Sequence, residues 1–159
     1  MTDLVRADGD AVIETVRRAA RAFDAADWPT LRACLADMVW TDYSAFRGTP
    51  PEIVSAGDYV ASRASALAGL VTEHVGWDHH AEVRGDRATC RSAYRITRTD
   101  PARADGANRL VTTGHYHHGL ARAADGWRID RIRQTVDTLE GERSVHGALR
   151  NDGQADGDA

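Results

Sequence analysis

The sequence predicts an α+β protein in which three N-terminal helices cover one face of a curved, mixed or antiparallel sheet. Over the first third of the chain, apolar residues recur at three- and four-residue spacing, as they do in amphipathic helices. The remainder holds four long stretches typical of β-strands, and two of the gaps between them are short turns containing Gly and Asp. We therefore expect one domain over residues 1–141, followed by a polar, flexible tail at residues 142–159.

The first two helices are predicted on either side of a short Asp-Trp-Pro sequence. Asp8 or Asp10 is suited to cap the first helix, and Asp24 lies at the edge of its apolar face. That face is formed by Val12, Ile13, Val16, Ala20 and Phe23. Because proline is tolerated only in a first helical turn, Pro29 predicts the start of a short second helix over residues 29–35.

A first strand is expected at residues 38–43, and a loop with two prolines follows at residues 47–51. Ser55 and Asp58 have the spacing of a helix-capping pair, which predicts a third helix from there to about residue 68. Further strands are expected at residues 71–83, 88–99, 109–122 and 127–139. Three helices cannot cover both faces of so long a sheet, so we expect a homodimer or higher homo-oligomer paired through the outer face.

Composition and charge argue against several classes of protein. The chain has 159 residues and a hydrophobic fraction of 42%, enough for one domain with a substantial core. Its formal net charge of −4 argues against nucleic-acid binding through phosphate neutralisation, and no apolar stretch approaches a membrane span. Every basic residue is Arg and Ala is abundant, which favours a GC-rich bacterial source. Neither Cys34 nor Cys90 has a zinc-ligand or CxxC spacing, so we expect a reduced, cytoplasmic protein.

The order of four segments points to chemistry inside the cup of the sheet. A carboxylate, Asp24, lies in the first helix, Tyr43 follows the first strand, and His74 lies near the start of the second. A hairpin that ends in Gly126-Trp127 comes last. Imidazole is suited to proton transfer near neutral pH, and a carboxylate that accepts its other ring N–H fixes the tautomer. These positions predict an acid/base pair.

The segments FDAADWPTLR, DYSAF, TEH and the paired Gly-x-Tyr and Gly-Trp-Arg-Ile resemble the SnoaL-like group of the NTF2-like superfamily. Within it the chain looks most like the scytalone dehydratase and bile-acid dehydratase branch, over residues 12–139. The resemblance implies a cone-shaped NTF2-like fold and a catalytic pair formed by Asp24 and His74. It also implies that Tyr43 polarises a substrate carbonyl through water and that Phe46 lines the pocket. No cofactor and no metal are implied.

Strand alternation predicts which side chains face the pocket. Counted from Arg98, the pocket face of the strand at residues 88–99 is formed by Cys90, Ser92, Tyr94, Ile96 and Arg98. The substrate-binding candidates on this strand, on the strand at residues 109–122 and on the last strand are Tyr94, Ile96, Arg98, Tyr116, His118 and Ile132. Arg98 is expected either to bind an anionic substrate oxygen or to pair with Asp24. Phe23 and Arg98 stand where the scytalone-processing members have Tyr and His, so a substrate other than scytalone is expected. His115 and His117 fall on the face opposite His118, so these three cannot converge on a metal ion. His74, Asp78 and His80 share a face, which permits a site unless a bulge shifts the strand.

The expected function is that of a cofactor-free lyase, a dehydratase acting on a cyclic or polyketide-like β-hydroxy carbonyl compound in bacterial secondary metabolism. His74 serves as base and then acid, Asp24 orients it, and Tyr43 assists at the carbonyl. Two alternatives stay open at this point. One is a polyketide cyclase or isomerase that uses the same pair. The other is a non-catalytic, small-molecule-binding dimer module, because fold does not fix function.

Overall fold

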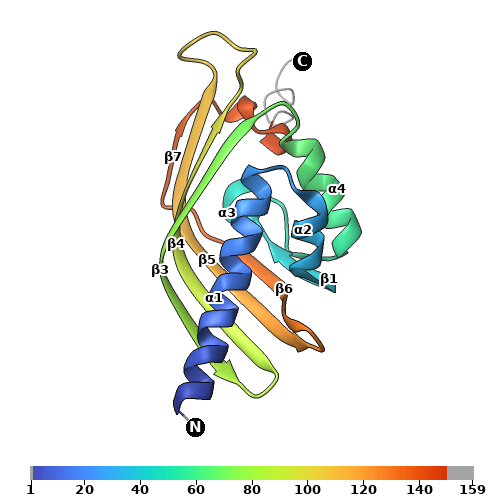
Figure 1. Ribbon diagram of the computed structural model, residues 1–159. Helices are drawn as coiled ribbons and strands as arrows, with labels where there is room; N and C mark the ends of the chain where they lie inside the picture. Colours follow the sequence, from blue (N-terminus) through green and yellow to red (C-terminus); the bar gives the residue numbers. More distant parts are fainter. Residues whose placement is uncertain (1, 150–159) are drawn as a thin grey trace.

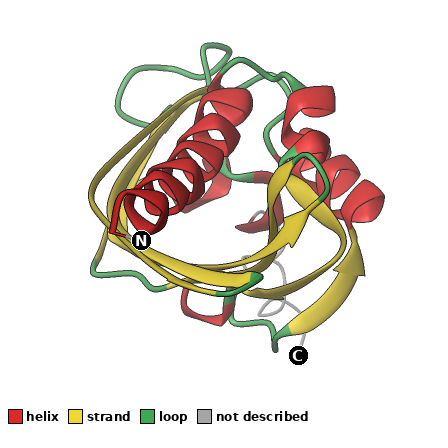
Figure 2. Ribbon diagram, turned by 60° about the horizontal axis from the view of Figure 1, so that its bottom comes forward, coloured by secondary structure: helices red, strands yellow, loops and turns green. Residues whose placement is uncertain are grey.

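The computed structural model describes residues 2–149. These residues form a curved, seven-stranded sheet, and the N-terminal helix crosses its concave side (Figure 1, Figure 2). The predicted α+β class, with a curved sheet and N-terminal helices on its concave side, is confirmed. Among the described residues, no helix is both long enough and apolar enough to cross a membrane.

The helices are α1 (Thr2–Asp24), α2 (Trp28–Ala33), α3 (Ser44–Arg47) and α4 (Ala56–Ala66). The Asp27 carboxylate accepts the N–H of Thr30 at 3.1 Å and caps α2, while the Ser55 hydroxyl accepts the N–H of Asp58 at 3.0 Å and caps α4. The single turn α3 was not predicted. It includes the start of the expected loop and ends at Gly48, whose φ of 73° suits glycine.

The strands are β1 (Leu35–Asp42), β2 (Glu52–Ser55), β3 (Val71–Arg84), β4 (Arg87–Thr99), β5 (Arg109–Ala123), β6 (Gly126–Gln134) and β7 (Thr138–Gly141). Their order is β2-β1-β6-β5-β4-β3, and β7 pairs with the start of β5. Only the pairing of β1 with β6 is parallel, so the sheet is mixed. The short edge strand β2 was missed because its four residues follow two prolines.

The main core lies between α1, α2 and the concave face of the sheet. Its fully buried members include Val12, Leu31, Val39, Leu120 and Ile129. Along β4 the alternation is regular, and the inward side chains are at most 4% exposed: Cys90, Ser92, Tyr94, Ile96 and Arg98. The concave side therefore combines an apolar floor with several buried polar groups.

A bulge in β3 changes which of its side chains face inward. Trp77 pairs with Ala93 and His80 with Arg91, so β3 has one residue more than β4 between these pairs. Asp78 takes a φ of 52°, and the alternation shifts by one position there. As a result His79, rather than Asp78, follows His74 on the concave face.

The expected strand at residues 127–139 is two strands, because the chain leaves the ladder at residues 135–137. The Thr135 carbonyl lies so close to Gly114 that a Cβ there would be 2.1 Å from its oxygen. The Thr135 and Asp137 N–H groups still bond to the carbonyls of His115 and Thr113, at 2.9 and 2.7 Å. The close approach of the chain at Thr135 to β5 thus requires a glycine at position 114.

Part of the predicted tail packs against the fold. Val145 is fully buried and Leu149 is 3% exposed, and both contact Phe46 and Leu110 in a second apolar cluster. The expectation of a loose segment from residue 142 is therefore wrong for residues 142–149. It failed because the few apolar side chains of this segment stand in a largely polar sequence. Residues 150–159 lie outside the described residues.

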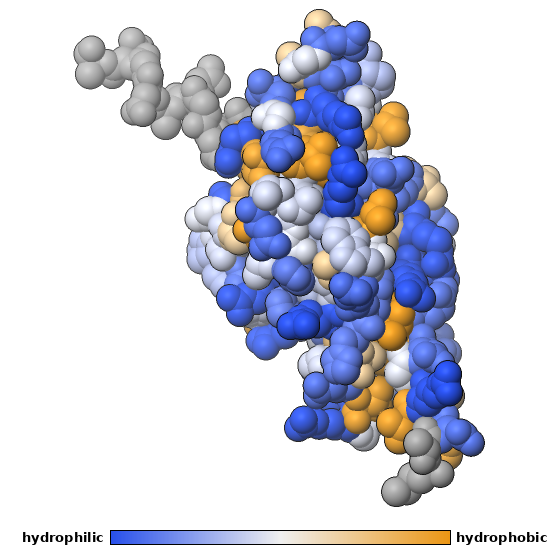
Figure 3. Space-filling view, turned by 90° about the vertical axis from the view of Figure 1, so that its left-hand side faces the viewer, coloured by the Kyte–Doolittle hydropathy of each residue, from blue (hydrophilic) through white to orange (hydrophobic). Residues whose placement is uncertain are grey.

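The face shown in Figure 3 is mostly hydrophilic, with small apolar areas separated by polar side chains. On β3, the exposed apolar residues are Val71, Val75 and Trp77. The predicted pairing with a second copy stays a prediction.

Candidate functional site

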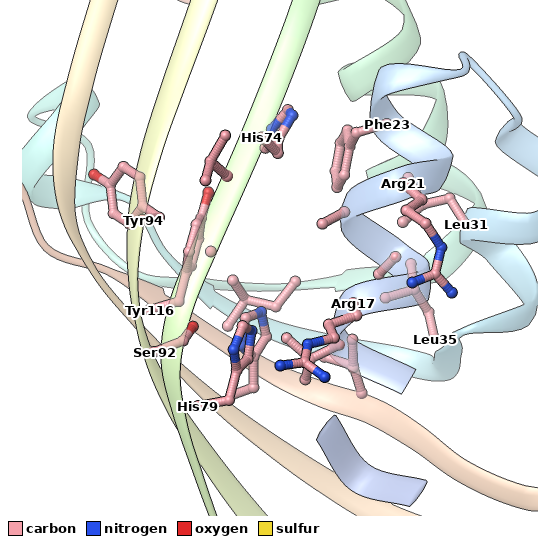
Figure 4. Close-up of a pocket in the computed structure, with 18 of the residues that line it drawn as sticks. Arg17, Arg21, Phe23, Leu31, Leu35, His74, His79, Ser92, Tyr94 and Tyr116 are labelled. Carbon is pink, nitrogen blue, oxygen red and sulfur yellow. The ribbon is translucent and has the colours of Figure 1, made fainter. Parts of the chain in front are cut away.

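A cavity of about 330 Å³ lies between α1 and the concave face of the sheet (Figure 4). Phe23 and Arg17 of α1 form one side, and Tyr94 of β4 and Tyr116 of β5 form the other. Most of the lining is apolar, which suits an organic ligand rather than an ion.

Asp24 and His74 meet where the end of α1 contacts the start of β3. The Nδ1 atom of His74 lies 2.6 Å from the Asp24 Oδ1 atom. The backbone N–H of His74 also donates to both carboxylate oxygens, at 3.0 and 2.9 Å, and the Thr72 hydroxyl donates at 3.3 Å. Because a carboxylate only accepts, Nδ1 carries the proton in this contact, and Nε2 is left for a ligand.

The His74 ring is further fixed by stacking on Phe23, with centroids 5.2 Å apart and planes at 24°. Its side chain is 13% exposed and lines the cavity, whereas that of Asp24 is 29% exposed and lies behind it. The carboxylate therefore acts on a ligand through the imidazole.

Tyr43 and Tyr59 form a hydroxyl pair at the cavity wall, with their oxygens 2.7 Å apart. Burial raises the pKa of both phenols, so both stay protonated near neutral pH. When one hydroxyl donates to the other, the acceptor's own proton is available to a ligand oxygen.

The other two tyrosines have different partners. Tyr94 donates its hydroxyl proton to the Thr135 carbonyl at 2.7 Å, which fixes its ring at the wall. Tyr116 packs 4.7 Å from Tyr94 and accepts a hydrogen bond from Gln134 Nε2 at 3.1 Å. The Tyr116 hydroxyl thus keeps its own proton for donation, and burial raises its pKa.

Two histidines stand at the end of the cavity away from His74, where Figure 4 shows His79 beside Ser92. His118 stacks on Tyr116 at 5.2 Å. Burial, with smaller contributions from the neighbouring histidines, lowers the pKa of His118 to about 4. The Nδ1 atoms of His79 and His118 are both buried without a hydrogen-bond partner among the described residues. Both imidazoles are therefore neutral near neutral pH, and Arg17 of α1 is the charged side chain beside them.

A second, smaller cavity of about 30 Å³ adjoins the first, and Tyr43 and His74 line both. It contains Arg98, which is 4% exposed and donates from Nη1 to the Thr112 hydroxyl at 3.0 Å. Asp24 is not among the hydrogen-bond or ion-pair partners of Arg98. Of the two roles expected for this arginine, pairing with Asp24 is therefore excluded.

The structure places most of the predicted site residues at one or the other of the two cavities. Asp24 and His74 are in contact, and the main cavity is lined by Tyr43, Tyr94, Tyr116, His118 and Ile132. Phe46 and Arg98 line the smaller cavity. Ile96 is buried but lines neither.

Nine polar side chains that line the two cavities were not among the predicted site residues: Arg17, Arg21, Arg47, Tyr59, Arg63, His79, Ser92, Gln134 and His146. Ser92 had been placed on the inward face of its strand, but not among the site residues. His79 was hidden by the bulge, and Tyr59 and Arg63 belong to a helix whose apolar face gave no clear signal. Among residues 2–149, no three His, Cys, Asp or Glu side chains are grouped to hold a metal ion.

The chain matches the model of the SnoaL-like domain family over residues 5–133. No curated protein matches it. The match covers most of α1, the chain from there through most of β6, and both members of the Asp24–His74 contact.

Solved structures with the same fold include the Kfla4162 protein from Kribbella flavida. It has 28% identity and a TM-score of 0.80, with 88% of this chain and 95% of that chain covered. A candidate scytalone dehydratase from Novosphingobium aromaticivorans gives 13% identity and a TM-score of 0.77, covering 89% and 91%. A type 2 hexachlorocyclohexane dehydrochlorinase gives 14% and 0.72, covering 91% and 95%. At such identities the last two show the fold alone.

Proposed function

Since the chain belongs to the SnoaL-like domain family, we propose that it is a lyase of the dehydratase type, with His74 as the proton-transfer residue. The observation that carries the proposal is the 2.6 Å contact between Asp24 and His74 at the edge of an open, mainly apolar cavity. Two fold neighbours, the candidate scytalone dehydratase and the dehydrochlorinase, are named for elimination reactions.

The proposed reaction begins when His74 Nε2 takes the proton from the carbon next to a substrate carbonyl. The electron pair of that C–H bond moves toward the carbonyl oxygen and gives an enolate. The protonated imidazole then gives its proton to the hydroxyl on the β-carbon, which leaves as water while the C=C bond forms. General acid/base catalysis of this kind contributes on the order of 10²–10⁴ in rate.

Asp24 supports both transfers without touching the substrate. By accepting the Nδ1–H, it holds the ring in one tautomer and stabilises the imidazolium that forms between the two steps. The Tyr43–Tyr59 pair supplies a neutral phenol donor for the enolate oxygen, and burial keeps that donor protonated. All three elements of the mechanism come from side chains of this chain.

The substrate is proposed to be a one- or two-ring β-hydroxy carbonyl compound of the polyketide type. The cavity volume of about 330 Å³ and its mixed aromatic and aliphatic lining suit such a body. Ser92, His79 and His118 at the far end offer hydrogen bonds to a second oxygen of the ligand.

The test is a panel of cyclic β-hydroxy ketones incubated with the protein, with product mass and enone absorbance recorded. Loss of 18 mass units identifies dehydration, whereas unchanged mass with a shifted double bond identifies isomerisation. His74→Ala should lower turnover on the order of 10²–10⁴ while leaving the circular dichroism spectrum unchanged. His80→Ala is the matched control, because His80 lies on the same strand with 71% of its side chain exposed. Full turnover by His74→Ala would refute the mechanism.

A further inference from the structure

Three arginines from three different elements meet at the smaller cavity. Arg47 ends α3, Arg63 lies in α4 and Arg98 in β4, and all three line the same space of about 30 Å³. None of the residues that line it is Asp or Glu. A concentration of positive charge therefore stands directly beside His74, which lines this cavity too.

The arginine N–H groups in this cavity are only partly bonded. Arg98 Nε, Arg63 Nε, and both Nε and Nη2 of Arg47 are buried and have no hydrogen-bond partner among residues 2–149. The partners that do exist are neutral, since Arg98 bonds to the Thr112 hydroxyl and Arg63 to the Ser62 hydroxyl, each at 3.0 Å. No carboxylate within the described part of the chain forms an ion pair with any of the three.

Aromatic rings account for part of the environment of these cations. The guanidinium carbon of Arg98 lies 5.0 Å from the centroid of Phe46, and that of Arg47 lies 4.5 Å from the centroid of Tyr43. Arg63 lies 5.5 Å from the same Tyr43 ring. Such contacts stabilise the flat faces of the guanidinium groups, but the N–H groups that point along the guanidinium edges are left for another acceptor.

Burying charge without a counter-charge is unfavourable, and three like charges in one small space add repulsion. Arg98 is 4% exposed and Arg63 is 7% exposed, so water screens neither of them well. Arginine keeps its charge in proteins, and its fork of N–H donors matches the two oxygens of a carboxylate. The cavity has room on the order of two water-sized groups, which is the size of a carboxylate rather than of a phosphate ester.

We propose that the smaller cavity binds a carboxylate group of the ligand, while the ring body of the same ligand occupies the main cavity. The two spaces adjoin, since Phe23, Tyr43, His74 and Tyr116 line both of them. Carboxylate binding follows from the arginines alone. The claim that this ligand is the substrate, a cyclic carboxylic acid anchored next to His74, rests on the proposed lyase function.

The test compares 2-naphthoate with 2-naphthamide, which has the same ring body but no charge, by isothermal titration calorimetry. The naphthoate should bind at least about tenfold more tightly, as expected for hydrogen bonds to charged groups. Arg98→Met should remove this preference without weakening amide binding. Arg95→Met is the matched control, because Arg95 is exposed on the opposite face of β4 and should leave both affinities within twofold.

Two further variants keep the outcome clear. Arg47 is only half-buried, so Arg47→Gln should lower the naphthoate preference even where Arg98→Met fails to fold. His74→Ala should retain the preference, so carboxylate binding and catalysis are judged separately. Equal affinities for acid and amide in the wild type would overturn the proposal. The proposal would also be overturned if millimolar chloride or acetate stabilised the protein against unfolding as much as naphthoate does. That result would identify a site for simple anions.

Discussion

His118 gives the most direct quantitative test of the cavity described above. Its ring lies at the far end of the main cavity against Tyr116, and burial lowers its pKa from 6.5 to about 4. In the unfolded chain the same imidazole is in water and has its ordinary pKa of about 6.5. The folded state therefore opposes protonation of this side chain.

The sign and size of the effect follow from this difference in pKa. Between pH 6.5 and pH 4 the unfolded chain binds a proton at His118 more readily than the folded chain does, so stability falls as the pH falls through this window. At pH 5 the difference corresponds to about 2 kcal/mol of unfolding free energy. Above pH 7 it contributes almost nothing, because the imidazole is then neutral in both states.

The assay is urea unfolding at pH 7.5 and pH 5.0 for the wild type and for His118→Gln, which cannot titrate. Because other groups contribute equally to both proteins, the variant should lose about 2 kcal/mol less on acidification. With a denaturant slope of about 1–3 kcal/mol/M, this difference in unfolding free energy shifts the midpoint of urea unfolding by roughly 1 M. His80→Gln, at a site 71% exposed, should behave like the wild type. Equal acid losses in the wild type and His118→Gln would show that His118 is hydrated, and would refute the assignment of a buried, neutral imidazole at this end of the cavity.

Three other predictions test the positions on which the site depends. Asp24→Asn should move His74 toward the tautomer protonated at Nε2, which ¹⁵N NMR of the imidazole nitrogens detects; an unchanged tautomer would contradict the role of Asp24. Gly114→Ala should lower the free energy of unfolding in urea by roughly 3 kcal/mol or more, because the new Cβ would meet the Thr135 carbonyl oxygen at 2.1 Å. A decrease below about 1 kcal/mol would contradict this contact. Leu149→Ala should cost about 2 kcal/mol in the same assay, whereas no loss would show that this segment does not pack on the sheet.

The parts of the fold that were predictable are those in which a regular period is preserved. Along β4, alternation counted from Arg98 placed Cys90, Ser92, Tyr94 and Ile96 inward, and all four are buried. No bulge interrupts the pairing of β4 with β5, so one correct anchor sets the whole strand. The same reasoning placed His118 on the concave side and His117, which is exposed, on the other.

The parts that were not predictable depend on a break in that period. In β3 a single extra residue near Asp78 turns His79 inward, and no residue type signals its position. The arginine cluster was missed for another reason. Arg47, Arg63 and Arg98 are separated by at least 16 residues along the chain, and a surface arginine has the same local sequence as a buried one. Only the packing of α3 and α4 on the sheet brings them together.

Asp24 connects the fold with the proposed chemistry, because one carboxylate makes both kinds of contact. It accepts the backbone N–H of His74 and the Thr72 hydroxyl, which joins the end of α1 to the start of β3, and it accepts the imidazole Nδ1–H as well. Alanine at this position would loosen the junction and release the ring together, so lost activity could not separate the two roles. Asparagine keeps a carbonyl oxygen for the backbone N–H. A changed His74 tautomer in Asp24→Asn at an unchanged melting temperature would therefore assign Asp24 to positioning the imidazole, whereas a lower melting temperature with the tautomer retained would assign it to the junction alone.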